Sequence, residues 1–209
     1  MMEVIMRLFV LGASGGVGRQ IIDQAIERGD QVTAFVRSPE KLGPQREGLT
    51  TRRGDPRDAA ELAAALPGHD AVLSMLGPPG PGPTTIMRDS ARSTVAAMQA
   101  VGMRRLLVVS AAVLFDGAGI IVGLMRRTLL RNVAQDSAEM ERIVMASGMD
   151  WTIARPPRLT NGPLTRRYKV EDGRIPRGKW IVSRADVADF LLSELHQGKY
   201  THKIVGMAR

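Results

Sequence analysis

The hydrophobic positions of this chain follow two periods, one typical of strands and one typical of helices. Residues 8–11 and 70–76 are short, largely apolar runs, as in strands of a parallel sheet that is covered on both faces. Apolar residues from Val17 to Ile26 recur instead at helical spacing, up to a stop at Gly29. The predicted strands are residues 8–11, 31–36, 49–52, 70–76, 104–112, 151–154 and 203–205, and the predicted helices are residues 17–26, 59–66, 84–101, 135–146 and one beginning at residue 183.

This alternation of strands and helices predicts an α/β fold with a doubly wound parallel sheet. The 209 residues fit a single domain, 1–209, and the sequence shows no internal repeat and no linker. Residues 168–170 and 179–182 are predicted to form a hairpin-like pair, within a small C-terminal lobe on the substrate side. The helix that follows is expected to begin with a capping box, because Ser183 precedes Asp186 by three residues.

The first predicted strand leads directly into a glycine-rich turn and a helix, the order that a dinucleotide site requires. The turn, residues 12–18, has the sequence GASGGVG. Gly12 permits a tight turn, Gly15 lets backbone N–H groups approach a pyrophosphate, and Gly18 lets the helix pack close to the strand. The anion is then held at a helix N-terminus, where the helix dipole favours negative charge. An ordinary glycine-rich loop is the alternative for the motif alone.

The end of the second predicted strand bears on the choice between NAD(H) and NADP(H). An NAD site places an acidic residue near this point to bind the ribose 2′-hydroxyl, but here the strand ends in Arg37, with Ser38 beside it. A guanidinium pairs with phosphate oxygens, so the sequence favours NADP(H). An exposed charge at a strand end is the alternative for Arg37. Asp55, after the third strand, is interpreted either as a contact to the adenine side or as a loop and capping residue.

Further candidates lie where the later strands end, which is the ligand side of such a sheet. Leu76 and Gly77 close the fourth strand, ahead of a loop rich in proline and glycine at residues 78–83. Ser110 falls at the end of the fifth strand, and the sixth is broken by the sequence Arg-Pro-Pro-Arg at residues 155–158. The candidate residues are therefore predicted to lie together at one edge of the sheet, where the strands end.

Composition excludes several kinds of site. The chain has no cysteine, hence no disulfide, cysteine nucleophile or thiolate metal site, and a reducing cytoplasm is the expected location. The three histidines lack ligand-like partners at short spacing, so no metal is expected. The net charge of +8 raises nucleic acid as a partner, but the chain has only four Phe, two Tyr and two Trp and no nucleic-acid motif. An anionic cofactor and a small acidic acceptor explain the charge instead.

Two segments bear on membranes and partners. Residues 1–7 lack the pattern of a signal peptide, and no apolar run approaches the ~20 residues of a membrane span, so no membrane association is expected. Residues 114–131 have no regular pattern. A mobile cover over the substrate, a partner surface, a membrane-touching segment and an irregular helix all stay open for them. We expect a monomer or a weak homodimer.

Several longer stretches resemble the atypical short-chain dehydrogenase/reductase family, in its NAD(P)H-binding branch with NmrA-like proteins and biliverdin reductase B, or flavin reductase. They are VRSPEKL, MLGPPGPGPTTIMRDSARSTVAAM, VVSAAVL, ARPPRLTNGPLT and VSRADVADFLL, beside the glycine turn. The resemblance covers nearly the whole chain and implies a Rossmann fold that binds NADP. The residues assigned to the cofactor are Gly12, Ser14, Gly15, Gly16, Val17, Gly18, Arg37, Ser38, Asp55, Leu76, Gly77, Ser110 and Pro157.

Within this set the resemblance implies Arg37 on the 2′-phosphate and Pro157 near the nicotinamide. Two positions differ from biliverdin reductase B: Ser110 and Ala111 stand in place of a Thr-Ser pair, and Arg158 stands in place of a histidine. These differences disfavour biliverdin or haem-derived substrates.

The sequence also lacks the Tyr-x-x-x-Lys pair of most short-chain dehydrogenases, since neither Tyr168 nor Tyr200 has a lysine four residues later. A flavin or quinone tolerates this absence, because the acceptor itself receives the hydride and water supplies protons. We therefore predict an NADPH-dependent reductase of a flavin, quinone or similar planar acceptor. Ser110 and Arg158 are its candidate catalytic residues, with Arg158 steadying negative charge.

Trp180 either borders the acceptor or is an ordinary packed aromatic. The alternative function is a non-catalytic NADP(H)-binding regulator or redox sensor, which NmrA-like relatives and the missing acid/base pair suggest.

Overall fold

The computed structural model describes residues 5–44, 46–78, 80, 82–115, 124, 128 and 130–209. In this part of the chain, eight strands form one sheet in the order β3-β2-β1-β4-β5-β6-β10-β8. The strands are β1 (Arg7–Leu11), β2 (Gln31–Val36), β3 (Leu49–Arg53), β4 (Ala71–Ser74), β5 (Arg105–Val109), β6 (Asp150–Arg155), β8 (Lys169–Asp172) and β10 (Lys203–Ala208). Every pairing in it is parallel except that of β8 with β10.

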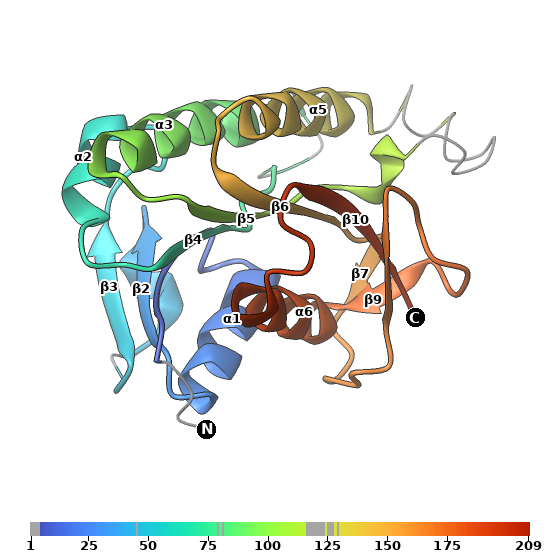
Figure 1. The fold of residues 1–209 in the computed structure, drawn as a ribbon, viewed down its shortest axis with the longest axis horizontal. Helices are drawn as coiled ribbons and strands as arrows, with labels where there is room; N and C mark the ends of the chain where they lie inside the picture. The colour runs from blue at the N-terminus through green and yellow to red at the C-terminus, as the bar shows by residue number, and fades with distance from the viewer. Residues whose placement is uncertain are drawn as a thin grey trace.

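Helices cover both faces of this sheet (Figure 1). They are α1 (Gly16–Glu27), α2 (Ala59–Ala65), α3 (Ile86–Val101), α5 (Arg131–Met145) and α6 (Arg184–Gln197). α1 and α6 pack together below the sheet in the view of Figure 1, and α2, α3 and α5 lie above it. Two apolar clusters result, one around Val10 and Leu191 and the other around Phe9 and Met98. The predicted doubly wound α/β fold is confirmed.

The order of the strands determines where a crevice for a ligand lies in the sheet. β1 pairs with β2 on one side and with β4 on the other, so the chain winds outward in opposite directions from the middle of the sheet. The connections that leave β1 and β4 therefore diverge, and a crevice opens at the carboxyl ends of these two strands. The glycine turn lies at this point.

The predicted hairpin in the C-terminal lobe is wrong. β8 pairs antiparallel with β10, whereas β9 (Ile181–Ser183) pairs in parallel with β7 (Arg158–Thr160) in a separate two-stranded sheet. The exposed side of β10 offers β8 a ready edge, and Lys179, just before β9, exchanges backbone hydrogen bonds with Arg209 at 2.7 and 3.3 Å. The pairing thus depends on residues far away in the sequence.

The Ser183 half of the expected capping box of α6 is confirmed, because the Ser183 side chain accepts a hydrogen bond from the Asp186 N–H at 2.9 Å, but the Asp186 carboxylate bonds to another loop. The Asp186 carboxylate accepts from the N–H groups of Thr165 and Arg166, at 2.7 and 2.9 Å. It therefore fixes the loop between β7 and β8 to the start of α6. Of residues 114–131, whose role the sequence left open, most lie outside the described residues.

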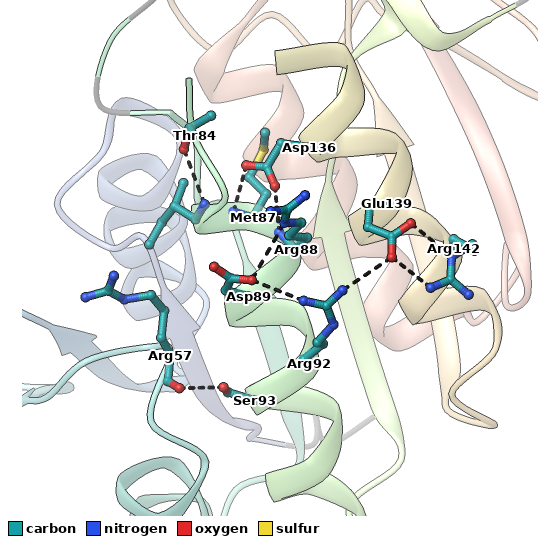
Figure 2. A network of polar contacts seen from close by, with 11 residues as sticks. Arg57, Thr84, Met87, Arg88, Asp89, Arg92, Ser93, Asp136, Glu139 and Arg142 are labelled. Atoms are coloured by element: carbon teal, nitrogen blue, oxygen red, sulfur yellow. Dashed lines mark hydrogen bonds and ion pairs between the residues drawn. The ribbon is translucent and has the colours of Figure 1, made fainter. Parts of the chain in front are cut away.

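The start of α3 is held by a residue of α5 (Figure 2). Asp136, only 2% exposed, accepts from the backbone N–H groups of Met87 and Arg88, each at 3.1 Å. Thr85, at the capping position, makes no side-chain capping bond itself. A carboxylate at a helix N-terminus also suits the helix dipole. Asp136 thus sets where α3 begins after the loop that leaves β4.

Replacing Asp136 with alanine is expected to destabilise the protein by about 1–3 kcal/mol, because a buried N–H group, that of Met87, and a partly buried one, that of Arg88, lose their acceptor. Urea unfolding measures this change. Asp89→Ala, on the exposed side of the same helix end, is the control and is expected to cost only about 0.5 kcal/mol. Equal losses for the two variants would contradict the capping role of Asp136.

Candidate functional site

The glycine turn joins β1 to α1 beside the end of β4. Gly12 has a φ of 76°, which side-chain-bearing residues rarely adopt. A Cβ on Gly12 would also lie 2.7 Å from the backbone carbonyl carbon and oxygen of Met75. The Gly15 N–H closes the turn on the Gly12 carbonyl at 3.0 Å. A Cβ on Gly18 would lie 2.7 Å from the Cα of Ala13, so α1 packs as closely against the turn as the sequence predicts.

The N-terminus of α1 faces outward from this turn. Gly15 occupies the capping position without a side-chain hydrogen bond, and the first turn carries no acidic residue. Gly15 and Gly16 are exposed, Ser14 is half-buried, and Val17 is buried. Because the first N–H groups of a helix have no acceptor within the helix, this end suits an anion held by backbone.

Arg37 follows β2 and is exposed, with Ser38 half-buried beside it. Sequence analysis missed a second arginine here, Arg53, whose Nε donates to the Arg37 carbonyl at 3.3 Å. The parallel pairing of β2 with β3 brings the two together, since Val36 and Arg53 are register partners. Two cations therefore lie at the predicted 2′-phosphate position.

After Ser38 the chain forms a short 3₁₀ helix, η1 (Pro39–Leu42), with Pro39 in its first turn. Ser38 occupies the capping position of this helix, but its side chain makes no capping bond. Arg19 of α1 ties this segment to the glycine turn, donating to the carbonyls of Ser14 and Lys41. Arg37 is thereby held in a fixed relation to the start of α1.

Asp55 is engaged by a neighbour in its own loop. Its two carboxylate oxygens accept from the Arg57 guanidinium at 3.0 and 2.6 Å, and these hydrogen bonds lower the pKa of Asp55 to about 2. The cap of α2 is Asp58, not Asp55. Because the pKa is depressed by folding, this half-exposed pair adds stability above pH ~4 that is lost as the pH falls toward 2. The adenine contact of Asp55 stays a prediction.

The ends of β4, β5 and β6 bring the remaining candidates to one edge, since these strands are neighbours in the sheet. The Ser110 N–H donates to the Ala154 carbonyl at 2.8 Å. Its Oγ is buried and has no hydrogen-bond partner among the described residues, which is uncommon for a buried hydroxyl. Pro157 is buried and Arg158 exposed, and Leu76, half-buried, and Gly77, exposed, follow β4.

Comparison with known proteins identifies the family. The sequence model of the family described as NAD(P)H-binding matches residues 12–198. The chain belongs to the NAD(P)H-binding family. The YwnB protein of Bacillus subtilis is 27% identical over 210 residues, which cover 95% of this chain and 96% of that protein. The resemblance stated from the sequence is confirmed at this level.

Solved structures share the fold of this NAD(P)H-binding protein. A short-chain dehydrogenase/reductase from Veillonella parvula DSM 2008, in complex with NADP, has a TM-score of 0.84 and 19% identity, over 99% of this chain and 95% of that one. ChuY, an anaerobillin reductase from Escherichia coli O157:H7, has a TM-score of 0.79 and 21% identity, over 97% and 96% of the two chains. The predicted Rossmann fold is thus confirmed.

The hydroxyl of Tyr168 in this NAD(P)H-binding protein is engaged in a structural contact. The Tyr168 hydroxyl donates to Asp189 Oδ2 at 2.7 Å, and burial together with the Asp189 carboxylate raises the pKa of Tyr168 far above its ordinary value. Asp189 also pairs with Arg28 at 2.8 Å, so Tyr168 belongs to a structural contact between the lobe and the helices. Tyr200 packs its ring against Phe190.

Trp180 is 39% exposed, so part of its ring is open to solvent and the rest is covered by the protein. It directly precedes Ile181, the register partner of Arg158 in the β7–β9 pair. Figure 1 shows this pair beside α6. The backbone bonds between Lys179 and Arg209 fix the segment that carries Trp180. The exposed indole of Trp180 therefore lies one residue before β9, and the exposed guanidinium of Arg158 belongs to the first residue of the neighbouring strand, β7.

An apolar pocket lies beneath this edge, between the sheet and helices α3 and α5, and Leu76, Met87, Val108, Met140 and Val144 contribute to its lining. Its apolar lining does not suit phosphates, and the glycine turn is not part of it. Within the described ranges, no group of three or more acidic or histidine side chains is placed to hold a metal. Nor does any helix in those ranges have the length and apolar character to cross a membrane.

Replacing Gly12 with alanine is expected to cost about 1–2 kcal/mol for the left-handed conformation and about 1–3 kcal/mol more for forcing a methyl group against backbone. It is also expected to abolish NADP⁺ binding. Urea unfolding and fluorescence titration measure the two effects. The control is Gly102→Ala, because Gly102 has a φ of 74° but open space around its Cβ position. A Gly12 variant no less stable than the Gly102 variant would contradict the close approach to Met75.

Proposed function

We propose that this protein is an NADPH-dependent reductase that delivers a hydride to a flavin, a quinone or a similar planar acceptor. The N–H groups at the start of α1 would hold the pyrophosphate, and Leu76 and Gly77 would lie along the adenosine half. Ser110 and Pro157 would lie near the nicotinamide. Bound NADPH supplies the hydride, while the chain positions both reactants and excludes water from the face between them.

Preference for NADPH is supported by the charge at the end of β2. Arg37 is exposed there, and the Arg53 Nε lies 3.3 Å from its carbonyl oxygen. A ribose 2′-phosphate would add a charge-assisted pair with the Arg37 guanidinium, which a 2′-hydroxyl does not. Ser38, half-buried beside Arg37, adds a hydroxyl donor at the same point.

The observation that carries the proposed chemistry is the exposed Trp180 next to the strand partner of Arg158. An exposed indole provides a face on which a planar ring stacks, and the Arg158 guanidinium would steady negative charge on the reduced acceptor. The hydroxyl of Ser110, which has no hydrogen-bond partner in the part of the chain that the structure describes, would complete the polar contacts. Because Tyr168 keeps its proton for Asp189, the protons of the reduced acceptor would come from water.

The name of ChuY describes an anaerobillin reductase. We extend only the reductase part of that description to this chain. The acceptor proposed here rests on Trp180, Arg158 and Ser110 and not on ChuY.

A steady-state assay tests the function. Purified protein is mixed with NADPH and, in turn, FMN, riboflavin and menadione without oxygen, and loss of absorbance at 340 nm is followed. NADPH consumption above the rate of a heat-inactivated sample is expected with at least one acceptor. Tight NADPH binding without consumption across the panel would overturn the reductase and favour the NADP(H)-binding regulator or redox sensor.

A variant of Trp180 tests the acceptor position separately. Trp180→Ala is expected to raise the KM for the acceptor about tenfold, because a stacking contact is worth about 1–3 kcal/mol, and to leave the NADPH dissociation constant unchanged. Trp180→Phe is expected to retain most of the affinity. The matched control is Met145→Ala, another exposed apolar residue, which should change neither constant. An unchanged KM in Trp180→Ala would contradict the stacking role.

A further inference from the structure

Arg184, the first residue of α6, reaches across to the glycine turn. A Cβ on Gly16 would lie 2.5 Å from the Arg184 Cδ and 2.6 Å from its Nε, so the arginine side chain lies directly over the first residue of α1. Gly16 is itself exposed, and Arg184 is half-buried. The sequence analysis assigned Gly16 to the cofactor and did not single out Arg184.

The charge around this guanidinium is uncompensated. Among the described residues it donates to a neutral acceptor, the Asn161 side-chain oxygen, at 2.6 Å, and no carboxylate of these residues lies within ion-pair distance of it. By contrast, Arg28, Arg105 and Arg155 all pair with buried carboxylates. Unlike these three half-buried arginines, Arg184 therefore has a positive charge that no carboxylate of the described residues neutralises.

Two helix dipoles oppose this placement. Arg184 stands in the first turn of α6 and lies over the first turn of α1, and a cation is disfavoured at both positive ends. An anion between the guanidinium and the N–H groups of α1 is attracted to both, and these attractions offset the repulsion. The family supplies such an anion, because NAD(P)H carries a pyrophosphate and the uncapped end of α1 is where the glycine turn receives it.

We propose that Arg184 is a ligand of the cofactor pyrophosphate, and that Asn161 orients its guanidinium over Gly16 without neutralising it. The pyrophosphate is then held on one side by the backbone of the turn and on the other by α6. Since α6 follows β9 directly, the same residue connects the cofactor to the lobe that carries Trp180. The inference rests on cofactor binding by the family and is independent of which acceptor the proposed function assigns.

Binding measurements without any acceptor test this role. The dissociation constants of NADP⁺, NAD⁺ and adenosine 2′-monophosphate are determined by calorimetry for the wild type and for Arg184→Ala. The variant is expected to bind NADP⁺ and NAD⁺ about tenfold more weakly, as for loss of one charge-assisted contact, and to bind adenosine 2′-monophosphate, which lacks the pyrophosphate, unchanged. Unchanged NADP⁺ affinity overturns the proposal, and so does an equal loss for all three ligands.

Further variants separate charge from packing. Arg184→Gln keeps the aliphatic stem over Gly16 and is expected to lose NADP⁺ affinity like the alanine variant, whereas Arg184→Lys is expected to retain most of it. Arg104→Ala is the matched control. Arg104 precedes β5, so it lies at the amino ends of the strands and away from the glycine turn, and it is paired with Asp150. It should leave all three constants unchanged. A glutamine variant that binds like the wild type overturns the proposal even if the alanine variant fails to fold.

A variant of Asn161 tests whether this residue orients Arg184 without neutralising it. Asn161→Asp places a carboxylate where the amide now accepts from Arg184, so an internal ion pair competes with the pyrophosphate. NADP⁺ binding is expected to weaken about tenfold in this variant, as in Arg184→Ala, and the added effect of the aspartate is expected to shrink when Arg184 is already alanine. Additive losses in the double variant overturn the link between the two residues. None of these outcomes depends on NADPH consumption.

Discussion

Replacing Arg37 with alanine is expected to weaken NADPH binding about 10- to 100-fold and to leave NADH binding nearly unchanged. The reason is the loss of a charge-assisted contact to the 2′-phosphate, worth about 1.5–3 kcal/mol, which NADH cannot make. The ratio of NADPH affinity to NADH affinity should fall close to one. A small remaining preference for NADPH is expected from Arg53, whose Nε donates to the Arg37 carbonyl. Titration of protein fluorescence with each cofactor gives the constants.

Arg46→Ala is the control for this change. Arg46 lies just before β3, at the amino ends of the strands and so away from Arg37, and it pairs on the surface with Asp23. Its loss should therefore change the affinity for neither cofactor. An Arg37 variant that loses equal affinity for NADPH and NADH would contradict the assignment of the 2′-phosphate to this residue. Higher salt should reduce the effect, because an exposed ionic contact is screened.

Replacing Glu141 with alanine is expected to destabilise the protein by about 3–5 kcal/mol, since it leaves the charge of Arg155 buried without a partner. The Glu141 side chain is 3% exposed and that of Arg155 13%, and the Arg155 Nε donates to the Glu141 carboxylate at 2.9 Å. Arg155 also lies over the Phe115 ring at 4.6 Å. Because Arg155 directly precedes the Pro-Pro break, the same loss should loosen the strand end that carries Pro157.

Urea unfolding of the holoprotein measures this loss, and Glu139→Ala is the matched control. Glu139 is on the same helix, α5, but pairs with Arg92 and Arg142 at the surface (Figure 2), where solvent screens ion pairs. Its replacement should cost a small fraction of the loss at Glu141. A double variant, Glu141→Leu with Arg155→Met, should recover much of the stability, since it removes both buried charges. A stable Glu141→Ala variant would show that the pair is not structurally required.

Features set by neighbouring residues could be predicted from the sequence. The glycine turn follows from the strict needs of Gly12 and Gly18 over a few residues, and the parallel sheet follows from apolar runs that alternate with helical periods. The cap at Ser183 joins residues that are only three positions apart in the sequence. In each case the physical cause lies within one element or one turn, so the residue pattern carries it.

Features set by tertiary contacts could not be predicted in this way. Arg53 reaches the cofactor corner through the pairing of β2 with β3, and Arg184 reaches Gly16 through the packing of α6 on α1. The partners of β8 and β9 depend on which strand edge is open nearby. Trp180 is exposed for the same kind of reason, because its segment is tied to Arg209 at the end of the chain. No local period in the sequence reports such contacts.

The most direct measurement is a single-turnover experiment. The one-to-one complex of protein and NADPH, freed of unbound NADPH, is mixed without oxygen with an excess of the acceptor that the panel selects, and absorbance at 340 nm is followed by stopped flow. One NADPH is expected to be consumed per protein chain, at a rate that falls when the transferred C4 hydrogen is deuterium and that drops in the Trp180→Ala variant at subsaturating acceptor. NADPH that stays bound and unoxidised with every acceptor would contradict hydride transfer by this protein.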